Sequence, residues 1–198
     1  MSDACEDVTI QFDDGTKMMA SSHVLSLASP VFRAMLASEL REGLTKRVRI
    51  SAEVGTQEAF HAFYKILLPG IGLLQPLTHS SIDSMVAMSH YYQVDAVKRV
   101  CEIWLLRQMN DDTADDVLIK RVCQAHVNRL DKLRERCINL IAERANIELS
   151  PLAKHPDLLL DVSNSIRYCL GLMRFHCKRR NSTALAPTDA KRLRRLLQ

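Results

Sequence analysis

The first fifty residues carry the alternating pattern of β-strands. Residues 8–12 switch between apolar and polar side chains, and this period of two predicts a half-buried strand. The sequence Asp-Asp-Gly at 13–15 supplies turn-forming residues, so 16–20 is predicted to return as the second strand of a hairpin. A third short strand is predicted at 47–50.

Elsewhere apolar residues recur every three or four positions, which is the spacing of one helix face. A helix is predicted to begin at Ser29-Pro30, with the serine as N-cap and the proline in the first turn. Gly and Pro residues within 69–76 predict a loop, and the polar residues 108–112 predict a joint. Apolar helical stripes occur within 60–67, 82–89, 97–105, 118–125, 130–141 and 159–173.

These patterns predict an α+β fold in three parts. We expect a strand-plus-helix domain at 6–108, an all-helical extension at 109–175, and a basic, disordered tail at 176–198. Hydrophobic residues make up 47% of the chain and charged residues 25%, which is ordinary for a globular protein. No apolar run approaches the roughly 18–20 residues that span a bilayer, and the acidic N-terminus does not resemble a signal peptide. We therefore expect an intracellular protein without membrane partners.

Positive charge is concentrated at the C-terminal end. Residues 167–198 contain nine Lys or Arg and one acid, whereas the rest of the chain is mildly acidic. The two basic clusters are separated by ten residues, a spacing that suits a bipartite nuclear import signal bound by an import receptor. The alternative is a solvated tail without a signal. Residues 192–197 could instead form a short helix with their leucines on one face. Nucleic-acid binding is not favoured, because no aromatic residue lies between the clusters. The cluster residues are Lys178, Arg179, Arg180, Lys191, Arg192, Arg194 and Arg195.

Candidate chemistry is sparse. The six cysteines are scattered and form no C-x-x-C pair, so we interpret them as reduced structural thiols and predict no metal site. The chain has no glycine-rich phosphate loop, no G-x-S-x-G and no H-E-x-x-H, and its seven histidines are dispersed. The sequence thus predicts a protein that is not an enzyme and uses no cofactor.

Several segments together resemble the BTB/POZ family. The strongest is 24–36, which reads V-L-S-L-A-S-P-V-F-R-A-M-L and is similar to the family's leucine followed by S-P-V-F. Asp7-Val8-Thr9-Ile10 resembles the opening strand, 47–50 the next strand, 59–70 the helix ending at Gly, and 92–102 the closing helices. The resemblance covers about 6–108 and implies a BTB/POZ fold, a small sheet flanked by helices.

The resemblance continues beyond that domain. Residues 117–141 look like the helical pair after the BTB domain of speckle-type POZ proteins and related cullin adaptors, and 155–159 (H-P-D-L-L) resembles its closing segment. This implies a BACK-like or 3-box extension. It also implies an adaptor of a third-cullin-type RING ubiquitin ligase, whose partners are the cullin, itself or other BTB proteins, and a substrate. His23 lies two positions later than the family's A-H-K/R, and we expect neither the additional N-terminal helix nor a MATH, kelch or zinc-finger domain.

The resemblance also implies binding residues. Leu40 and Glu42, with Glu39 beside them, stand where cullin-binding members carry a hydrophobic-x-Glu motif on a surface loop. A leucine can enter an apolar groove of the partner while a carboxylate orients it. The alternative is that Leu40 packs on its own helix and Glu42 is solvated.

Asp7, Val24 and Leu27 resemble positions that meet across the BTB dimer. We expect Asp7 to be buried and to need a partner, which a symmetric interface can supply. Packing of Val24 and Leu27 within one subunit is the alternative. A second class of function, favoured by the lack of a substrate-holding domain, is a BTB dimerisation module that pairs with or blocks full-length BTB proteins without recruiting cullin. With either function we expect the protein to be located in the nucleus, in the cytoplasm or in both.

Overall fold

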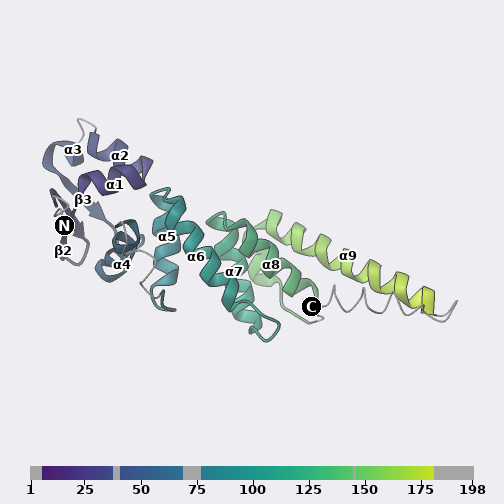
Figure 1. The fold of residues 1–198 in the computed structure, drawn as a ribbon. Helices are drawn as coiled ribbons and strands as arrows, with labels where there is room; N and C mark the ends of the chain where they lie inside the picture. The colour runs from purple at the N-terminus through teal and green to yellow at the C-terminus, as the bar shows by residue number, and fades with distance from the viewer. Residues whose placement is uncertain (1–5, 38–40, 69–76, 145, 181–198) are drawn as a thin grey trace. The chain divides into compact units, whose positions relative to one another are not determined.

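The N-terminal part is built around a small sheet. The structure, a computed structural model, describes residues 6–37, 41–68, 77–144 and 146–180 (Figure 1). Within these residues the central strand β1 pairs antiparallel with β2 and parallel with β3. The predicted strands are confirmed, as β1 (Val8–Phe12), β2 (Lys17–Ala20) and β3 (Arg47–Ile50).

The β1–β2 hairpin is closed by the predicted turn. Gly15 has a φ of +85°, a conformation that glycine adopts without a steric penalty. Asp14 Oδ1 accepts hydrogen bonds from the backbone N–H of Thr16 at 2.8 Å and from its hydroxyl at 2.6 Å. Because β1 alternates, Val8, Ile10 and Phe12 all point into the core and are at most 3% exposed.

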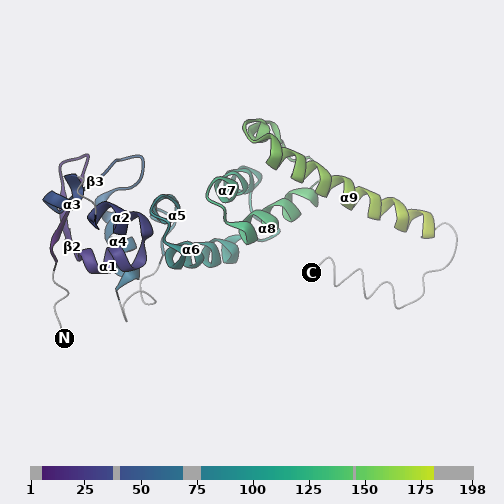
Figure 2. The ribbon, with the colours of Figure 1, turned by 90° about the horizontal axis from the view of Figure 1, so that it is seen from above.

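Helices cover the sheet and complete the first part of the chain. They are α1 (Ser22–Ala28), α2 (Pro30–Ala37), α3 (Arg41–Thr45), α4 (Gln57–Leu67), α5 (Ile82–Tyr91) and α6 (Asp95–Gln108). The helix α4 contacts α1, β2, α5 and α6, and therefore lies at the centre of this part (Figure 2).

Ser29 joins α1, α2 and the turn between α5 and α6. Its hydroxyl accepts a hydrogen bond from the backbone N–H of Phe32 at 3.0 Å, so it caps α2 as predicted. The same hydroxyl donates to the carbonyl oxygen of Tyr92 at 2.5 Å. Ser29 is fully buried, and its hydroxyl satisfies the carbonyl of Tyr92, 63 residues further along the sequence, as well as the N–H of Phe32.

The core contains a cluster of aromatic rings. Phe32 stacks on Tyr92 with ring centroids 4.1 Å apart, and Phe60 meets Phe32 edge-on at 6.4 Å. Phe12 and Phe63 also pack on Phe60, at 5.9 and 5.8 Å. Aromatic pairs add stability beyond the area that they bury, so this cluster gives the sheet and helices a rigid centre.

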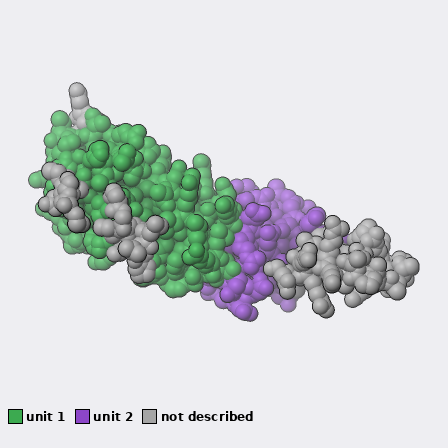
Figure 3. All heavy atoms as spheres, viewed as in Figure 1, with its two compact units in different colours: residues 1–109, 124–133 green, residues 110–123, 134–198 purple. Residues whose placement is uncertain are grey.

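The second part of the chain is helical. It contains α7 (Asp115–Val127), α8 (Asp131–Ala142), the 3-10 helix η1 (Ser150–Lys154) and α9 (Pro156–Arg180). The chain forms two compact units, residues 1–109 with 124–133 and residues 110–123 with 134–198 (Figure 3). The predicted fold class, α+β with a helical part after the sheet domain, is confirmed. No helix of the described residues is both long and apolar enough to cross a membrane.

Ion pairs connect the helices of the second unit. Arg134 on α8 pairs with Asp161 on α9. Arg144, just after α8, pairs with Asp115 at the start of α7 and donates to the carbonyl oxygen of Asp111 at 2.7 Å. The apolar stripes predicted in 118–125 and 130–141 are buried, including Leu118, Val122, Leu140 and Ile141. Of the stripe predicted in 159–173, Val162 is buried but Leu170 is 52% exposed.

The last helix is longer than the sequence pattern predicts. We expect structure to end at residue 175, but α9 continues to Arg180. The sequence from 172 to 180 contains no Pro or Gly, and basic residues at a helix C-terminus interact favourably with the helix dipole. The predicted boundary is therefore early.

Candidate functional site

Glu42 lies on a short helix and not on the predicted loop. It is in the first turn of α3, half-buried, with Leu44 beside it 74% exposed. The helix α3 contacts both α2 and β3, and Lys46, with a φ of +51°, turns the chain into β3. Glu42 is thus held by elements that belong to the core. Glu39 and Leu40 lie outside the described residues.

Tyr91 and Tyr92 face opposite surroundings at the end of α5. Tyr92 is 2% exposed, stacked on Phe32, and burial raises the pKa of its hydroxyl. Tyr91 meets the ring of Tyr92 edge-on at 4.9 Å but is 59% exposed. Tyr92 is thus a core residue, and the sequence analysis does not single out Tyr91 as a surface group. Its position off the apolar face of 82–89 is the signal that could have found it.

A surface hollow of about 860 Å³ lies beside Tyr91, within the first unit. The turn between α1 and α2 forms part of it through Pro30, and the α5–α6 turn forms most of the rest. His90, Lys98 and Arg129 bring basic groups to the hollow. Exposed tyrosine and arginine side chains around a hollow are typical of surfaces that bind other proteins.

The predicted dimer residues lie at the start of the fold. Val24 is half-buried on α1, while Leu27 is 73% exposed, so Leu27 does not pack within its own unit as the alternative interpretation requires. In the single chain Asp7 is exposed, and its burial in a symmetric interface stays a prediction. Its carboxylate accepts from the backbone N–H of Ser22 at 2.8 Å and the hydroxyl at 2.7 Å, and these bonds lower the pKa of Asp7.

The match to known families agrees with this architecture. The model of the BTB/POZ domain family matches residues 2–109, which include the whole sheet and the helices through α6. The chain belongs to the BTB/POZ family. The predicted resemblance is therefore confirmed.

Similar BTB proteins occur in animals and plants. The chain is 23% identical over 150 residues to BTB and MATH domain-containing protein 38 of Caenorhabditis elegans, covering 75% of this chain and 36% of that protein. It is 30% identical over 173 residues to BTB/POZ and TAZ domain-containing protein 5 of Arabidopsis thaliana, covering 85% and 46%. The chain thus spans less than half the length of these two relatives.

BTB domains are protein-interaction modules that associate with themselves and with other proteins, and the exposed groups here suit that role. Burial raises the pKa of Cys101 and Cys137 to about 12 and keeps these two thiols protonated. Among the described residues no three His, Cys, Asp or Glu side chains gather as a metal site requires.

The predicted import signal is only partly within the described residues. Lys178, Arg179 and Arg180 form the last positions of α9, so their backbone is helical and not part of a tail. Lys191, Arg192, Arg194 and Arg195 lie outside the described residues.

Proposed function

We propose that this BTB protein is an adaptor that connects a third-cullin-type RING ubiquitin ligase scaffold to another protein. The observation that supports the proposal best is the placement of Glu42 on α3, between α2 and β3. A carboxylate held by core elements can orient a partner, and Leu40, two residues earlier, is the apolar anchor.

The hollow beside α5 and α6 supports the proposal in a second way. A cullin helix that rests its apolar side against Leu40 needs further contact area, and Tyr91 offers a large side chain with few rotatable bonds. Lys98 and Arg129 would face acidic groups of the scaffold. We therefore include Tyr91 among the residues that contact the cullin.

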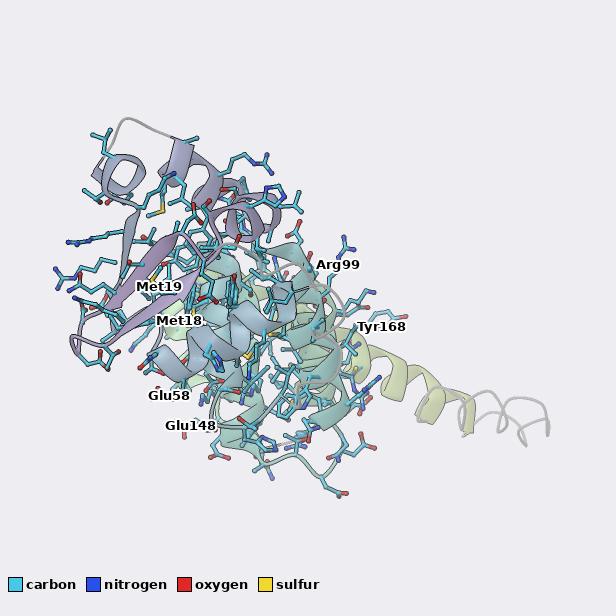
Figure 4. All side chains as sticks on the ribbon, turned by 60° about the vertical axis from the view of Figure 1, so that its left-hand side comes forward. Met18, Met19, Glu58, Arg99, Glu148 and Tyr168 are labelled. Carbon is cyan, nitrogen blue, oxygen red and sulfur yellow. The ribbon has the colours of Figure 1, made fainter. Side chains whose placement is uncertain are left out.

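Isothermal titration with the purified N-terminal domain of a third-type cullin tests the proposal. Removing a central anchor commonly costs about 2 kcal/mol or more, so Leu40→Asp with Glu42→Lys should weaken binding by well over about tenfold. The matched control is Leu160→Asp with Glu58→Lys, which changes the same residue types at exposed positions on α9 and α4. Glu58 is labelled in Figure 4. If both double variants bind like the wild type, the chain is not a cullin adaptor through this motif.

A dimerisation module is the second candidate function, and the exposure of Leu27 favours it. An exposed leucine on α1 beside Val24 is an apolar contact that a second BTB domain can cover. Sedimentation velocity should show a concentration-dependent dimer that Leu27→Asp and Val24→Asp both remove. Val127→Asp, at another exposed apolar position, should leave the dimer unchanged. A monomer at every concentration would exclude this function.

We also propose that the basic clusters direct nuclear import. The test fuses residues 176–198 to a cargo too large to diffuse through the nuclear pore. Cargo that stays in the cytoplasm excludes the signal, and nuclear cargo that returns to the cytoplasm when Lys191, Arg192, Arg194 and Arg195 become alanine supports it.

A further inference from the structure

The second unit carries a groove of about 650 Å³ between the first two turns of α7 and the segment leading into η1. Its apolar lining comes from Ile119, Cys123 and Pro151. Ile119 is buried and Cys123 is half-buried, so the groove reaches into the packed part of the unit. Burial also raises the pKa of the Cys123 thiol.

The edge of this groove is acidic. Glu148, before η1, is an exposed carboxylate (Figure 4). Asp116 on α7 is also exposed, and Asp115 beside it pairs with Arg144. Lys120 is the basic residue of the lining. An apolar floor between carboxylates is complementary to a segment that presents leucines and basic residues together.

We propose that residues 191–197 of the same chain dock in this groove. Their sequence is Lys-Arg-Leu-Arg-Arg-Leu-Leu, with four basic residues and three leucines in seven positions. The leucines cover Ile119, Cys123 and Pro151, while the basic residues face Asp116 and Glu148. The ordering cost is modest, because a tethered segment has an effective concentration of about 1 mM.

The chain is long enough for this contact. The helix α9 has 25 residues, which is about 37 Å at 1.5 Å per residue. Sixteen residues separate Arg180 from Leu196. Fully extended, this stretch spans at most about 53–58 Å, which exceeds the length of the helix, so the segment can fold back along α9 toward the groove.

A docked tail would regulate two surfaces at once. The groove would be closed to other proteins, and the second basic cluster would be held against carboxylates and hidden from an import receptor. A partner with higher affinity for either surface would release the tail, and this exchange would link occupancy of the groove to exposure of the cluster.

Cys123 provides the test, because the docked leucines would cover it. The full-length protein is treated with neutral N-ethylmaleimide, and peptide mass spectrometry follows modification at Cys123 and, as an internal reference, at half-buried Cys169 on α9. The tail variant changes Lys191, Arg192, Arg194 and Arg195 to Glu. A free-peptide Kd of about 0.1 mM predicts about tenfold slower modification of Cys123 in the wild type than in this variant.

Charge exchange keeps the test specific. Asp116→Lys with Glu148→Lys should make modification of Cys123 fast with the wild-type tail, and combining these changes with the acidic tail should restore slow modification. Glu135→Lys with Glu143→Lys, exposed acids on and just after α8 and outside the groove, is the matched control and should keep the wild-type difference. The protection should also weaken at about 1 M salt, where the Debye length is about 3 Å.

Two results would overturn the proposal. One is equal modification of Cys123 with either tail, or equal changes at Cys123 and Cys169. The other is protection that grows with protein concentration, which would assign the groove to the tail of a second copy. Protection that is independent of concentration and restored by charge exchange supports docking within one chain.

Discussion

Replacing Ser29 with alanine should destabilise the BTB domain more than its size suggests. The hydroxyl caps α2 through the N–H of Phe32 and donates to the carbonyl of Tyr92 at 2.5 Å. Loss of an N-cap costs about 1 kcal/mol, and a buried carbonyl left without a donor costs about 1–3 kcal/mol. Ser29→Ala should therefore lower the free energy of unfolding by about 2–4 kcal/mol, and the α5–α6 turn beside Tyr91 should loosen.

Urea unfolding measures this change. Trp104, the single tryptophan, lies on α6 with its ring 4.8 Å from that of His79, so its fluorescence reports on the same unit. Ser84→Ala on α5, also a change from serine to alanine in a helical domain, is the control and should stay within about 0.5 kcal/mol of the wild type. If Ser29→Ala is no less stable than Ser84→Ala, the hydroxyl does not hold the two turns together.

Further changes have expected outcomes of their own. Glu102 Oε1 accepts hydrogen bonds from two backbone N–H groups in the first turn of α8, at 2.9 and 3.2 Å. Glu102→Ala should therefore lower the free energy of unfolding by about 1 kcal/mol and speed hydrogen exchange of these amides. Glu102→Gln should lower it by less. Hydrogen bonds lower the pKa of Asp7 below its ordinary 3.8. The contribution of Asp7 to stability is therefore present above that pH and is lost as the pH falls below it. In acid denaturation, Asp7→Asn should reduce the dependence of the unfolding free energy on pH. Cys101 and Cys137 should resist iodoacetamide at pH 8 until urea unfolds the protein, as read by mass spectrometry, because burial raises both pKa values to about 12.

Local patterns in the sequence were sufficient to predict the strands and the start of α2. The alternation in 8–12 and the Asp-Asp-Gly turn depend on neighbouring residues, so they predict the hairpin directly. The Ser-Pro step at residue 29 predicts the start of α2 for the same reason. Together with the S-P-V-F resemblance they identify the BTB family, which the family match confirms.

The tertiary structure decided which of these residues face solvent and which contacts they make. Tyr91 and Tyr92 are adjacent and chemically alike, yet only the stack of Tyr92 on Phe32 determines that Tyr91 faces outward. The sequence predicts Glu42 on a loop, because five residues are too few for a clear helical period, and packing against α2 and β3 makes them a helix. The acidic groove joins 115–123 to 146–151, segments that local patterns cannot bring together. Sequence determines elements through contacts between near neighbours, whereas surfaces depend on contacts between distant residues that form only when the chain packs.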